Sequence, residues 1–236
     1  MKLRWIGQSG YILEDEATQI IIDPYLSDVV NKVASRPRLV EAPIQPEDIV
    51  ADYVICTHDH LDHIDPETIE RMNLDDIHFL TPSSCRERLK TLGCKKITTI
   101  DVGEHRSAGN FQITAVFADH TVDAIGIIVE FDSKKLYFSG DTLYHEKLEE
   151  LKELGITIMF ICINGQLGNM YVDEAVKLTK IINPQVGIPN HYGMFASNTE
   201  DPFRYTSQID NGFIMEFNKE YDISDLLGGH EACSID

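Results

Sequence analysis

A short apolar run that passes directly into a cluster of histidine and aspartate side chains constrains this chain more than any other feature. Residues 51–56 read Ala-Asp-Tyr-Val-Ile-Cys, and residues 58–63 read His-Asp-His-Leu-Asp-His. Three imidazoles and two carboxylates within six residues cannot all occupy one face of a helix or a strand. We therefore expect a buried strand that ends in a loop, with the loop side chains converging on a cation.

The residue types in this loop are those that bind transition metals. Neutral imidazole and carboxylate groups are ligands for Zn²⁺, Mn²⁺ and iron, and two ions can share such a cluster. His120, Asp141 and His191 add further residues of these types, each after the end of a later apolar run. A sheet can present such strand ends to a common cleft. The alternative, a solvated polar loop that happens to be rich in histidine, does not account for these downstream residues.

The rest of the sequence alternates short β-like runs with turns and a few helices. Strands are expected at residues 3–6, 11–13, 18–22, 53–57, 77–81, 96–102, 111–118, 124–131, 135–139, 158–163 and 186–189. Helices are expected at residues 66–72, 83–92, 147–154 and 172–182. Residues 27–47, with three prolines, are expected to form an irregular loop over the site. No linker or repeat divides the chain, so we expect one domain over residues 1–236, with two sheets packed face to face and helices outside.

Composition excludes several classes of function. The formal net charge is −19 at pH 7, from 20 Lys and Arg against 39 Asp and Glu residues. Such a surface does not displace counterions from phosphates, so long nucleic acid is disfavoured as a partner. No apolar run is long enough to cross a membrane, and the first residues lack the apolar segment of a signal peptide. The five cysteines are scattered and odd in number, which favours reduced thiols and a cytoplasmic location.

The order of these motifs resembles that of the metallo-β-lactamase-fold hydrolases, and the resemblance covers nearly all of the chain. It rests on Asp23-Pro24, His58-x-His60-x-Asp62-His63, His120, Gly140-Asp141-Thr142 and His191. Within that superfamily, residues 57–68, 117–120 and 190–195 are similar to the L-ascorbate 6-phosphate lactonase-like branch. The resemblance implies an α/β protein with an αββα four-layer sandwich.

The resemblance also implies a dinuclear metal site. The first ion would be bound by His58, His60 and His120, the second by Asp62, His63 and His191, with Asp141 bridging the two. Mn²⁺ is the metal that the lactonase branch implies, whereas the ligand set itself accepts Zn²⁺ as readily. The two ions would hold a shared water as hydroxide, and Asp62 would also act as the catalytic proton acceptor.

We therefore expect a hydrolase of a small ester or lactone, such as the sugar-acid phosphate lactone L-ascorbate 6-phosphate, acting by attack of metal-bound hydroxide. Two alternatives stay open: a phosphodiesterase or nuclease on the same fold, and a metal-binding regulatory protein without turnover. A di-iron oxidoreductase is disfavoured because no flavin or iron–sulfur module is visible, and a β-lactamase because no secretion signal is present. The expected partner is a small-molecule substrate, and the resemblance suggests a homo-oligomer.

Aspartates near the motif are candidates for orienting the ligand imidazoles, which usually donate their second N–H to a carboxylate or carbonyl. Asp59 lies inside the motif, and we favour this role for it. For Asp23 the role is balanced against a plain Asp-Pro turn. Asp65 is expected instead to cap the helix that opens at Pro66. Cys56 is expected to be a small core residue at the strand end rather than a neighbour of the metal.

Substrate contacts are expected from polar residues near strand ends that face the cleft. The candidates are Asn164, Asn190, Tyr192 and Arg204, and the first three could equally be turn residues. A phosphate on the substrate would need a cation. Of Arg4, Arg36, Arg38 and Arg204, the last three are favoured for that role.

The remaining histidines are expected at the surface. His145 could reach the mouth of the pocket, but an exposed position at the start of a helix is favoured. His78, His105 and His230 have no partners at ligand spacing.

Overall fold

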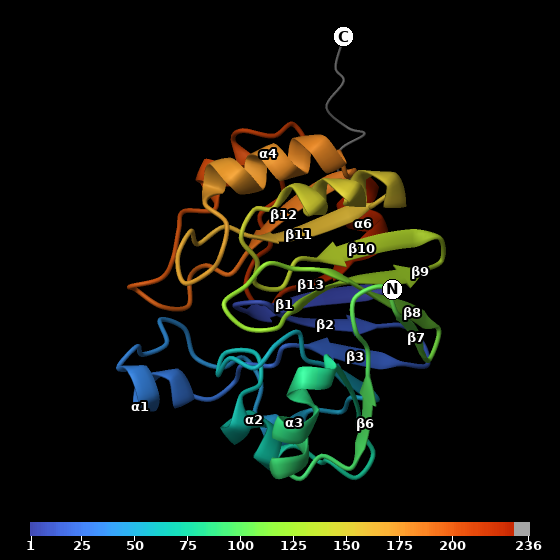
Figure 1. Cartoon of the computed structure of the whole chain (residues 1–236), viewed down its shortest axis with the longest axis vertical. Coiled ribbons are helices and arrows are strands. Elements are labelled where there is room, and N and C mark those ends of the chain that lie inside the picture. The colour runs from blue at the N-terminus through green and yellow to red at the C-terminus, as the bar shows by residue number, and fades with distance from the viewer. Residues whose placement is uncertain (229–236) are drawn as a thin grey trace.

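The computed structural model describes residues 1–228, which form two β-sheets with helices on their outer sides (Figure 1). The first sheet contains, in spatial order, β13 (Glu220–Asp222), β1 (Lys2–Gly7), β2 (Gly10–Glu14), β3 (Gln19–Ile22), β4 (Tyr53–Ile55), β5 (His78–Thr81) and β6 (Lys96–Thr99). The second contains β12 (Val186–Asn190), β11 (Ile158–Cys162), β10 (Lys134–Phe138), β9 (Ile125–Phe131), β8 (Phe111–Phe117) and β7 (His105–Ala108).

The helices divide between the two outer sides. The α-helices are α1 (Val29–Ala34), α2 (Pro66–Arg71), α3 (Arg86–Thr91), α4 (Val172–Ile182), α5 (Phe203–Thr206) and α6 (Ile223–Gly228). The 3-10 helices are η1 (Pro46–Asp48), η2 (Ser83–Cys85) and η3 (Glu146–Leu154). In Figure 1, α1, α2 and α3 lie beside the first sheet and α4 lies beyond the second.

Alternate residues of the first sheet pack into different cores. Ile20 and Ile22 of β3 join the core that also contains side chains of the second sheet. Ile21 joins a separate core with Ile69 of α2 and Leu89 of α3. Successive side chains of a strand point to opposite faces, so both faces of this sheet are buried. The layers follow the order helix, sheet, sheet, helix, which confirms the predicted αββα sandwich.

Strand direction brings the predicted ligands to one edge. Strands β3 to β6 are parallel, as are β10, β11 and β12. β8 is antiparallel to β9, which is antiparallel to β10, so β8 runs in the direction of β10. The carboxyl ends of β4, β8, β10 and β12 precede His58, His120, Asp141 and His191. Side chains far apart in sequence therefore share one end of the sandwich.

Several segments differ from the prediction. The strand expected at residues 96–102 ends at Thr99, and β7 follows as a separate edge strand whose His-Arg-Ser-Ala sequence has no apolar alternation. The segment 27–47 contains α1, because Val29 and Val30 pack against Met194 and Phe195. The helix expected at residues 147–154 is the 3-10 helix η3, and the short elements α5, β13 and α6 were not predicted.

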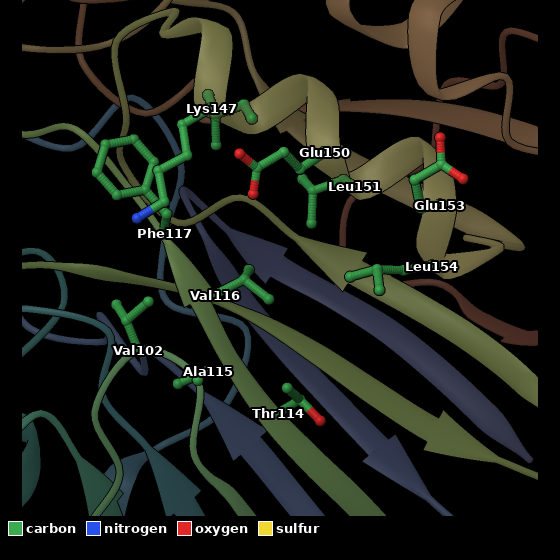
Figure 2. A pocket seen from close by; sticks show the side chains of 12 residues that line it. Val102, Thr114, Ala115, Val116, Phe117, Lys147, Glu150, Leu151, Glu153 and Leu154 are labelled. Atoms are coloured by element: carbon green, nitrogen blue, oxygen red, sulfur yellow. The ribbon is translucent and has the colours of Figure 1, made fainter.

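A cavity of about 520 Å³ lies between β8 and η3 (Figure 2). Val116, Leu151 and Leu154 line it, with the charged side chains of Lys147 and Glu150 beside them. None of the predicted metal ligands lines this cavity. None of the helices in residues 1–228 is both long and apolar enough to cross a membrane.

Candidate metal centre

The loop after β4 is fixed at both ends by buried aspartates. Asp23, which follows β3, accepts hydrogen bonds from the backbone N–H and the hydroxyl of Thr57 at 2.8 and 2.7 Å. Asp65 caps α2, as predicted, by accepting from the N–H groups of Glu67 and Thr68 at 3.0 and 3.1 Å. The motif between these two anchors is therefore held firmly at the carboxyl edge of the sheet.

The first group of candidate ligands, the imidazole cluster, consists of His58, His60 and His120. His60 Nδ1 lies 3.0 Å from His58 Nε2 and 3.1 Å from His120 Nε2. The three rings meet edge to face, with interplanar angles of 80°, 75° and 74°. Three ring nitrogens converging in this way form a neutral donor set for one cation.

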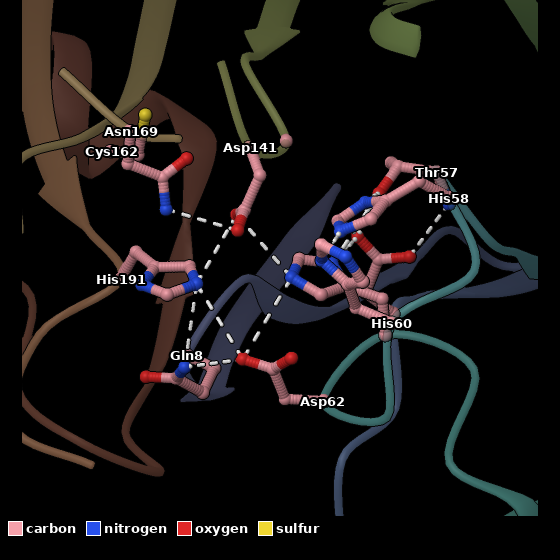
Figure 3. Close-up of polar contacts among 12 residues, drawn as sticks. Gln8, Thr57, His58, His60, Asp62, Asp141, Cys162, Asn169 and His191 are labelled. Carbon is pink, nitrogen blue, oxygen red and sulfur yellow. Dashed lines mark hydrogen bonds and ion pairs between the residues drawn. The ribbon is translucent and has the colours of Figure 1, made fainter. Parts of the chain in front are cut away.

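The second group, the aspartate–histidine cluster, consists of Asp62, His63 and His191. Asp62 Oδ2 lies 3.6 Å from His191 Nε2 and 4.0 Å from His63 Nε2. Asp141 lies between the two clusters (Figure 3). Its Oδ1 is 3.3 Å from His63 Nε2 and 3.2 Å from His191 Nε2, and its Oδ2 is 3.9 Å from His120 Nε2. The fold thus brings together every residue that the sequence predicted as a ligand.

The nitrogens that face away from the clusters have partners of their own. His63 Nδ1 lies 2.7 Å from Asp23 Oδ2, and His120 Nδ1 lies 2.9 Å from the carbonyl oxygen of Gly168. His58 Nδ1 lies 3.1 Å from Thr57 Oγ1. Such contacts fix the ring orientation and the tautomer of a ligand histidine. The orienting role considered for Asp23 is therefore the one that its geometry supports.

Gln8 and Asn169 hold the two carboxylates, and sequence reasoning missed both. Gln8 Nε2 donates to Asp62 Oδ2 at 2.8 Å, and Asn169 Nδ2 donates to Asp141 Oδ2 at 2.9 Å (Figure 3). Both amides are buried. Gln8 has a left-handed backbone conformation, with φ of 49°, in the turn between β1 and β2. The sequence Gly-Gln-Ser-Gly does not predict this contact, because the contact depends on the loop that carries Asp62, which is distant in sequence.

Gly168 is required for the contact with His120. Its φ is 91°, and a Cβ atom there would lie 2.7 Å from His120 Nδ1. Only glycine allows both this conformation and this close approach of the backbone.

The two clusters differ in their electrostatics. Burial lowers the pKa of His58 well below its usual value, and burial together with His120 lowers the pKa of His60. Burial would also lower the pKa of His63 and His191, but the carboxylates of Asp141 and Asp62, joined at His63 by Asp23, together outweigh it, and both pKa values are raised. Burial alone would raise the pKa of Asp141, but these two imidazoles hold that pKa well below its usual range.

The donor set fits divalent metal ions. The buried atoms His63 Nε2 and Asp141 Oδ1 lie 3.3 Å apart, but neither forms a hydrogen bond of suitable geometry with a group in residues 1–228. A buried polar atom without a partner destabilises a protein unless a ligand compensates it. Imidazole nitrogens and carboxylate oxygens are the donors that Zn²⁺ and Mn²⁺ accept. The inward-facing atoms therefore suit the ions that the sequence predicted.

A cavity of about 350 Å³ opens in front of the clusters. Four candidate ligands line it: His60, Asp62, Asp141 and His191. The rest of its wall is formed by Val30, Arg36, Leu61, Thr121, Leu167, Asn169, Phe195 and Asn198. The cavity has the size of a small-molecule site.

Two predicted contacts are wrong because their side chains point elsewhere. Asp59 is exposed and lies 3.7 Å from Arg88 Nε, so it orients no ligand imidazole. Arg204 lies on the short helix α5, where its exposed guanidinium pairs with Glu200 at 2.6 Å. It does not line the cavity.

The other predicted substrate contacts do not line the cavity either. Tyr192 turns into the core, where its ring lies 4.9 Å from that of Trp5. Asn190 is buried, and its side-chain amide has no partner among the described residues. Asn164 Nδ2 donates to Asn198 Oδ1 at 2.8 Å, so it acts on the cavity wall only through Asn198.

Of the arginines considered for a phosphate, only Arg36 lines this cavity. Arg38 donates to the carbonyl oxygens of Val40, Tyr25 and Ser27 and is thereby occupied in holding its own loop. Arg4 lies at another surface, 3.4 Å from Asn218.

The other histidines and Cys56 that the sequence analysis considered are not members of the two clusters. His145 caps η3 at the surface, as predicted, and His105 is exposed. His78 is not a free surface residue, because it stacks on Tyr53 and lies 2.7 Å from Thr98 Oγ1. Cys56 lies in the core, as predicted. His230 and Cys233 lie outside the described residues.

Comparison with known proteins shows the family of the chain. A family model described as "Beta-lactamase superfamily domain" matches residues 2–191. A UPF0173 metal-dependent hydrolase of Archaeoglobus fulgidus is 29% identical over 219 residues, covering 86% of this chain and 87% of the relative. The structure of Igni18, a metallo hydrolase of Ignicoccus hospitalis, matches with a TM-score of 0.77 and 22% identity over 94% of this chain and 98% of its own.

A further structure, an isothiocyanate hydrolase from Delia radicum gut bacteria, has a TM-score of 0.79 and 19% identity over 94% of this chain and 99% of its own. These two solved structures establish the likeness of fold, and the family model covers most of the sequence. The chain therefore belongs to the β-lactamase superfamily domain family.

Proposed function

We propose that this protein is a metal-dependent hydrolase whose reaction takes place at the two clusters described above. The observation that carries the proposal is the position of Asp141, a buried carboxylate with one oxygen toward each cluster. The family assignment and the metal-dependent hydrolases among the relatives support it.

The proposed metal ligands are the same residues that the sequence suggested. His58, His60 and His120 would hold one divalent ion, Asp62, His63 and His191 a second, and Asp141 would contact both. Zn²⁺ and Mn²⁺ both suit this set of nitrogen and oxygen donors. When bound, such ions supply Lewis acidity toward a scissile carbonyl and lower the pKa of water.

The residues of the chain itself supply orientation and proton transfer. Asp62 lines the cavity and is the proposed proton acceptor. All the contacts described for Asp62 use Oδ2, which Gln8 holds by its amide, so Oδ1 is the oxygen available to take a proton. Asp23 and the carbonyl of Gly168 keep the rings of His63 and His120 turned toward the centre. Apolar side chains such as Leu61 and Phe195 limit the entry of water.

The proposed substrate is a small ester or lactone. A cavity of about 350 Å³ suits a small molecule and not a polymer, and the net charge of −19 opposes binding of long nucleic acid. The similarity of residues 57–68 to the lactonase-like branch supports a sugar-acid phosphate lactone such as L-ascorbate 6-phosphate as the first compound to test. Self-association stays a prediction.

We further propose a reducing compartment such as the cytoplasm. The cysteines in the described part of the chain, Cys56, Cys85, Cys94 and Cys162, are free and buried. Buried thiols without disulfides are typical of such a compartment.

The test combines metal analysis with a hydrolysis screen. Purified protein is assayed for bound metal and for turnover of phosphorylated sugar lactones, plain sugar lactones, aryl esters and aryl phosphodiesters. The assays are repeated after chelation and after Zn²⁺ or Mn²⁺ is restored. We expect bound metal, lactone or ester turnover, loss on chelation and recovery on restoration. Turnover of phosphodiesters alone would favour a phosphodiesterase, and metal binding with complete inactivity would favour a regulatory protein.

A further inference from the structure

The cavity in front of the clusters has three kinds of wall. The candidate ligands form its floor. Val30, Leu61, Leu167 and Phe195 form an apolar part, and Thr121, Asn169 and Asn198 provide neutral polar groups. Among the described residues that line it, Arg36 is the only arginine or lysine.

Arg36 is held at the cavity by the residues around it. Ser35, in a left-handed conformation, ends α1 and turns the chain. Arg38 then ties the segment to backbone carbonyls, including that of Tyr25 at 2.8 Å, and the N–H of Leu39 donates to the carbonyl of Met194 at 2.8 Å. Arg38 therefore fixes the conformation of this loop. The neighbouring guanidinium of Arg36 is not needed for that purpose and is free for another role.

Arg36 has no carboxylate within ion-pair distance in residues 1–228, although the chain has a large excess of acidic residues. By contrast, Arg71, Arg106 and Arg204 each lie within 2.9 Å of a glutamate oxygen. Arg36 is only partly exposed. A half-buried guanidinium without a counter-ion in a cavity is suited to binding an anion, since its donors match a carboxylate or a phosphate in pairs.

The positive charge of Arg36 is surrounded by negative charge, both in the cavity and over the whole protein. Asp62 and Asp141 line the same cavity, and the whole protein carries a charge of −19. An anionic molecule is repelled by such a surface unless a local cation compensates. Arg36 provides that cation at the cavity wall. Asn198, whose side chain Asn164 holds at 2.8 Å, adds a neutral polar group to the same wall.

We propose that Arg36 is an anion-binding residue that selects esters or lactones carrying a second, non-reacting carboxylate or phosphate group. The apolar part of the substrate would lie along Leu61 and Phe195, between the reacting carbonyl and the anion. This inference rests on the proposed function and names the substrate class of the same site.

The test uses probes whose binding does not require turnover. Butyrate has one carboxylate, glutarate has a second at the other end of a chain of similar length, and 4-phosphonobutyrate has a phosphonate there. Their affinities for the Zn²⁺-loaded protein are measured by calorimetry for the wild type, Arg36→Gln and Arg36→Lys. Arg204→Gln is the matched control, since it removes an arginine that lies outside the cavity.

We expect wild type and Arg204→Gln to bind glutarate or 4-phosphonobutyrate about 10–100-fold more tightly than butyrate, the range expected for hydrogen bonds to a charged group. Arg36→Gln should lose this advantage while its affinity for butyrate is unchanged, and Arg36→Lys should recover part of it. The probe with the larger advantage distinguishes a carboxylate from a phosphate substrate. Equal melting temperatures of the variants would exclude a folding defect.

The proposal is overturned if the second anionic group gives no advantage in wild type, or if the advantage persists in Arg36→Gln. If instead the proposed function is wrong, the result differs. The tighter binding of probes with a second anionic group would still depend on Arg36, but the hydrolysis screen would find no ester or lactone turnover.

Discussion

The two clusters of the candidate metal centre are made from similar residues but are supported in opposite ways. The rings of the imidazole cluster are held by neutral groups, the hydroxyl of Thr57 and the carbonyl of Gly168. The aspartate–histidine cluster is surrounded by carboxylates, since Asp23 supports His63 and Asp62 is itself a member. Burial accordingly lowers the pKa of His58, whereas neighbouring carboxylates outweigh burial and raise the pKa of His63.

This difference indicates that the two clusters have different chemical roles. Neutral donors leave more positive charge on a bound ion, which suits it to polarise a carbonyl. A carboxylate-rich cluster neutralises more of that charge and places a proton acceptor, Asp62, beside the cavity. Asp141 is the only member shared by both environments among the candidate ligands. If the two clusters are distinct sites joined at this residue, substitutions in each should have different effects on metal binding.

Asp141→Ala should have the largest effect, because it removes the shared carboxylate and leaves the five candidate imidazoles facing one another. We expect loss of metal from both clusters and a fall in kcat of about 10³-fold or more. Metal per chain and turnover of the best substrate from the screen are the measurements. Asp59→Ala is the matched control, since it removes the same charge from the motif at a side chain that faces Arg88. Similar metal content in both variants would contradict the bridging role.

Asp23→Asn should weaken the aspartate–histidine cluster selectively. The amide cannot accept from both Thr57 and His63 as the carboxylate does, so the ring of His63 loses its orientation. We expect metal affinity to fall by about 10–100-fold at this cluster, with the imidazole cluster retained. Calorimetric titration of apo-protein with Zn²⁺ should then show one tight step in place of two. Equal weakening of both steps would argue against separate clusters.

Metal binding should depend on pH more strongly at the aspartate–histidine cluster. Ligand imidazoles must be neutral, so protons compete with metal at any histidine whose pKa is raised. The pKa of His63 and that of His191 are raised, and those of His58 and His60 are lowered. Acidification from about pH 7.5 to about pH 6.5 should therefore weaken this cluster by roughly tenfold and the imidazole cluster by less. Zn²⁺ titrations at the two pH values measure this, and parallel loss at both clusters would contradict it.

Gln8→Ala should have the smallest effect of this series. It removes a hydrogen bond to Asp62 Oδ2 and a 3.3 Å contact with His191 Nε2, but no candidate ligand. We expect kcat to fall by about three- to tenfold, with metal content and KM unchanged. Gln166→Ala, at an exposed glutamine, is the control. A change in KM alone would place Gln8 in substrate binding instead of in positioning Asp62.

Much of the fold and the ligand set could be predicted because both depend on local patterns. Apolar runs mark the buried strands, and their directions bring His58, His120, Asp141 and His191 to one edge. The supporting contacts could not be predicted in the same way. Gln8 and Gly168 lie in turns whose composition is ordinary, and they meet their partners only through the tertiary fold.

Nearness to a strand end also failed to predict which way a side chain points. Tyr192 directly follows a candidate ligand, yet His191 has a left-handed backbone with φ of 58°, and the next side chain packs on Trp5. Asp59 lies between two candidate ligands but faces Arg88. Arg36, in contrast, lines the cavity because a helix within the supposedly irregular segment brings it there.

The segment between β11 and α4 has a consequence for how such a protein can diverge. Its Gly168 orients His120, its Asn169 holds Asp141, and its Leu167 forms part of the cavity wall. A mutation that reshapes the wall here also disturbs the metal centre. New substrate preferences should therefore arise more readily by changes near α1, where Val30 and Arg36 face the cavity without contacting a ligand residue in the described contacts.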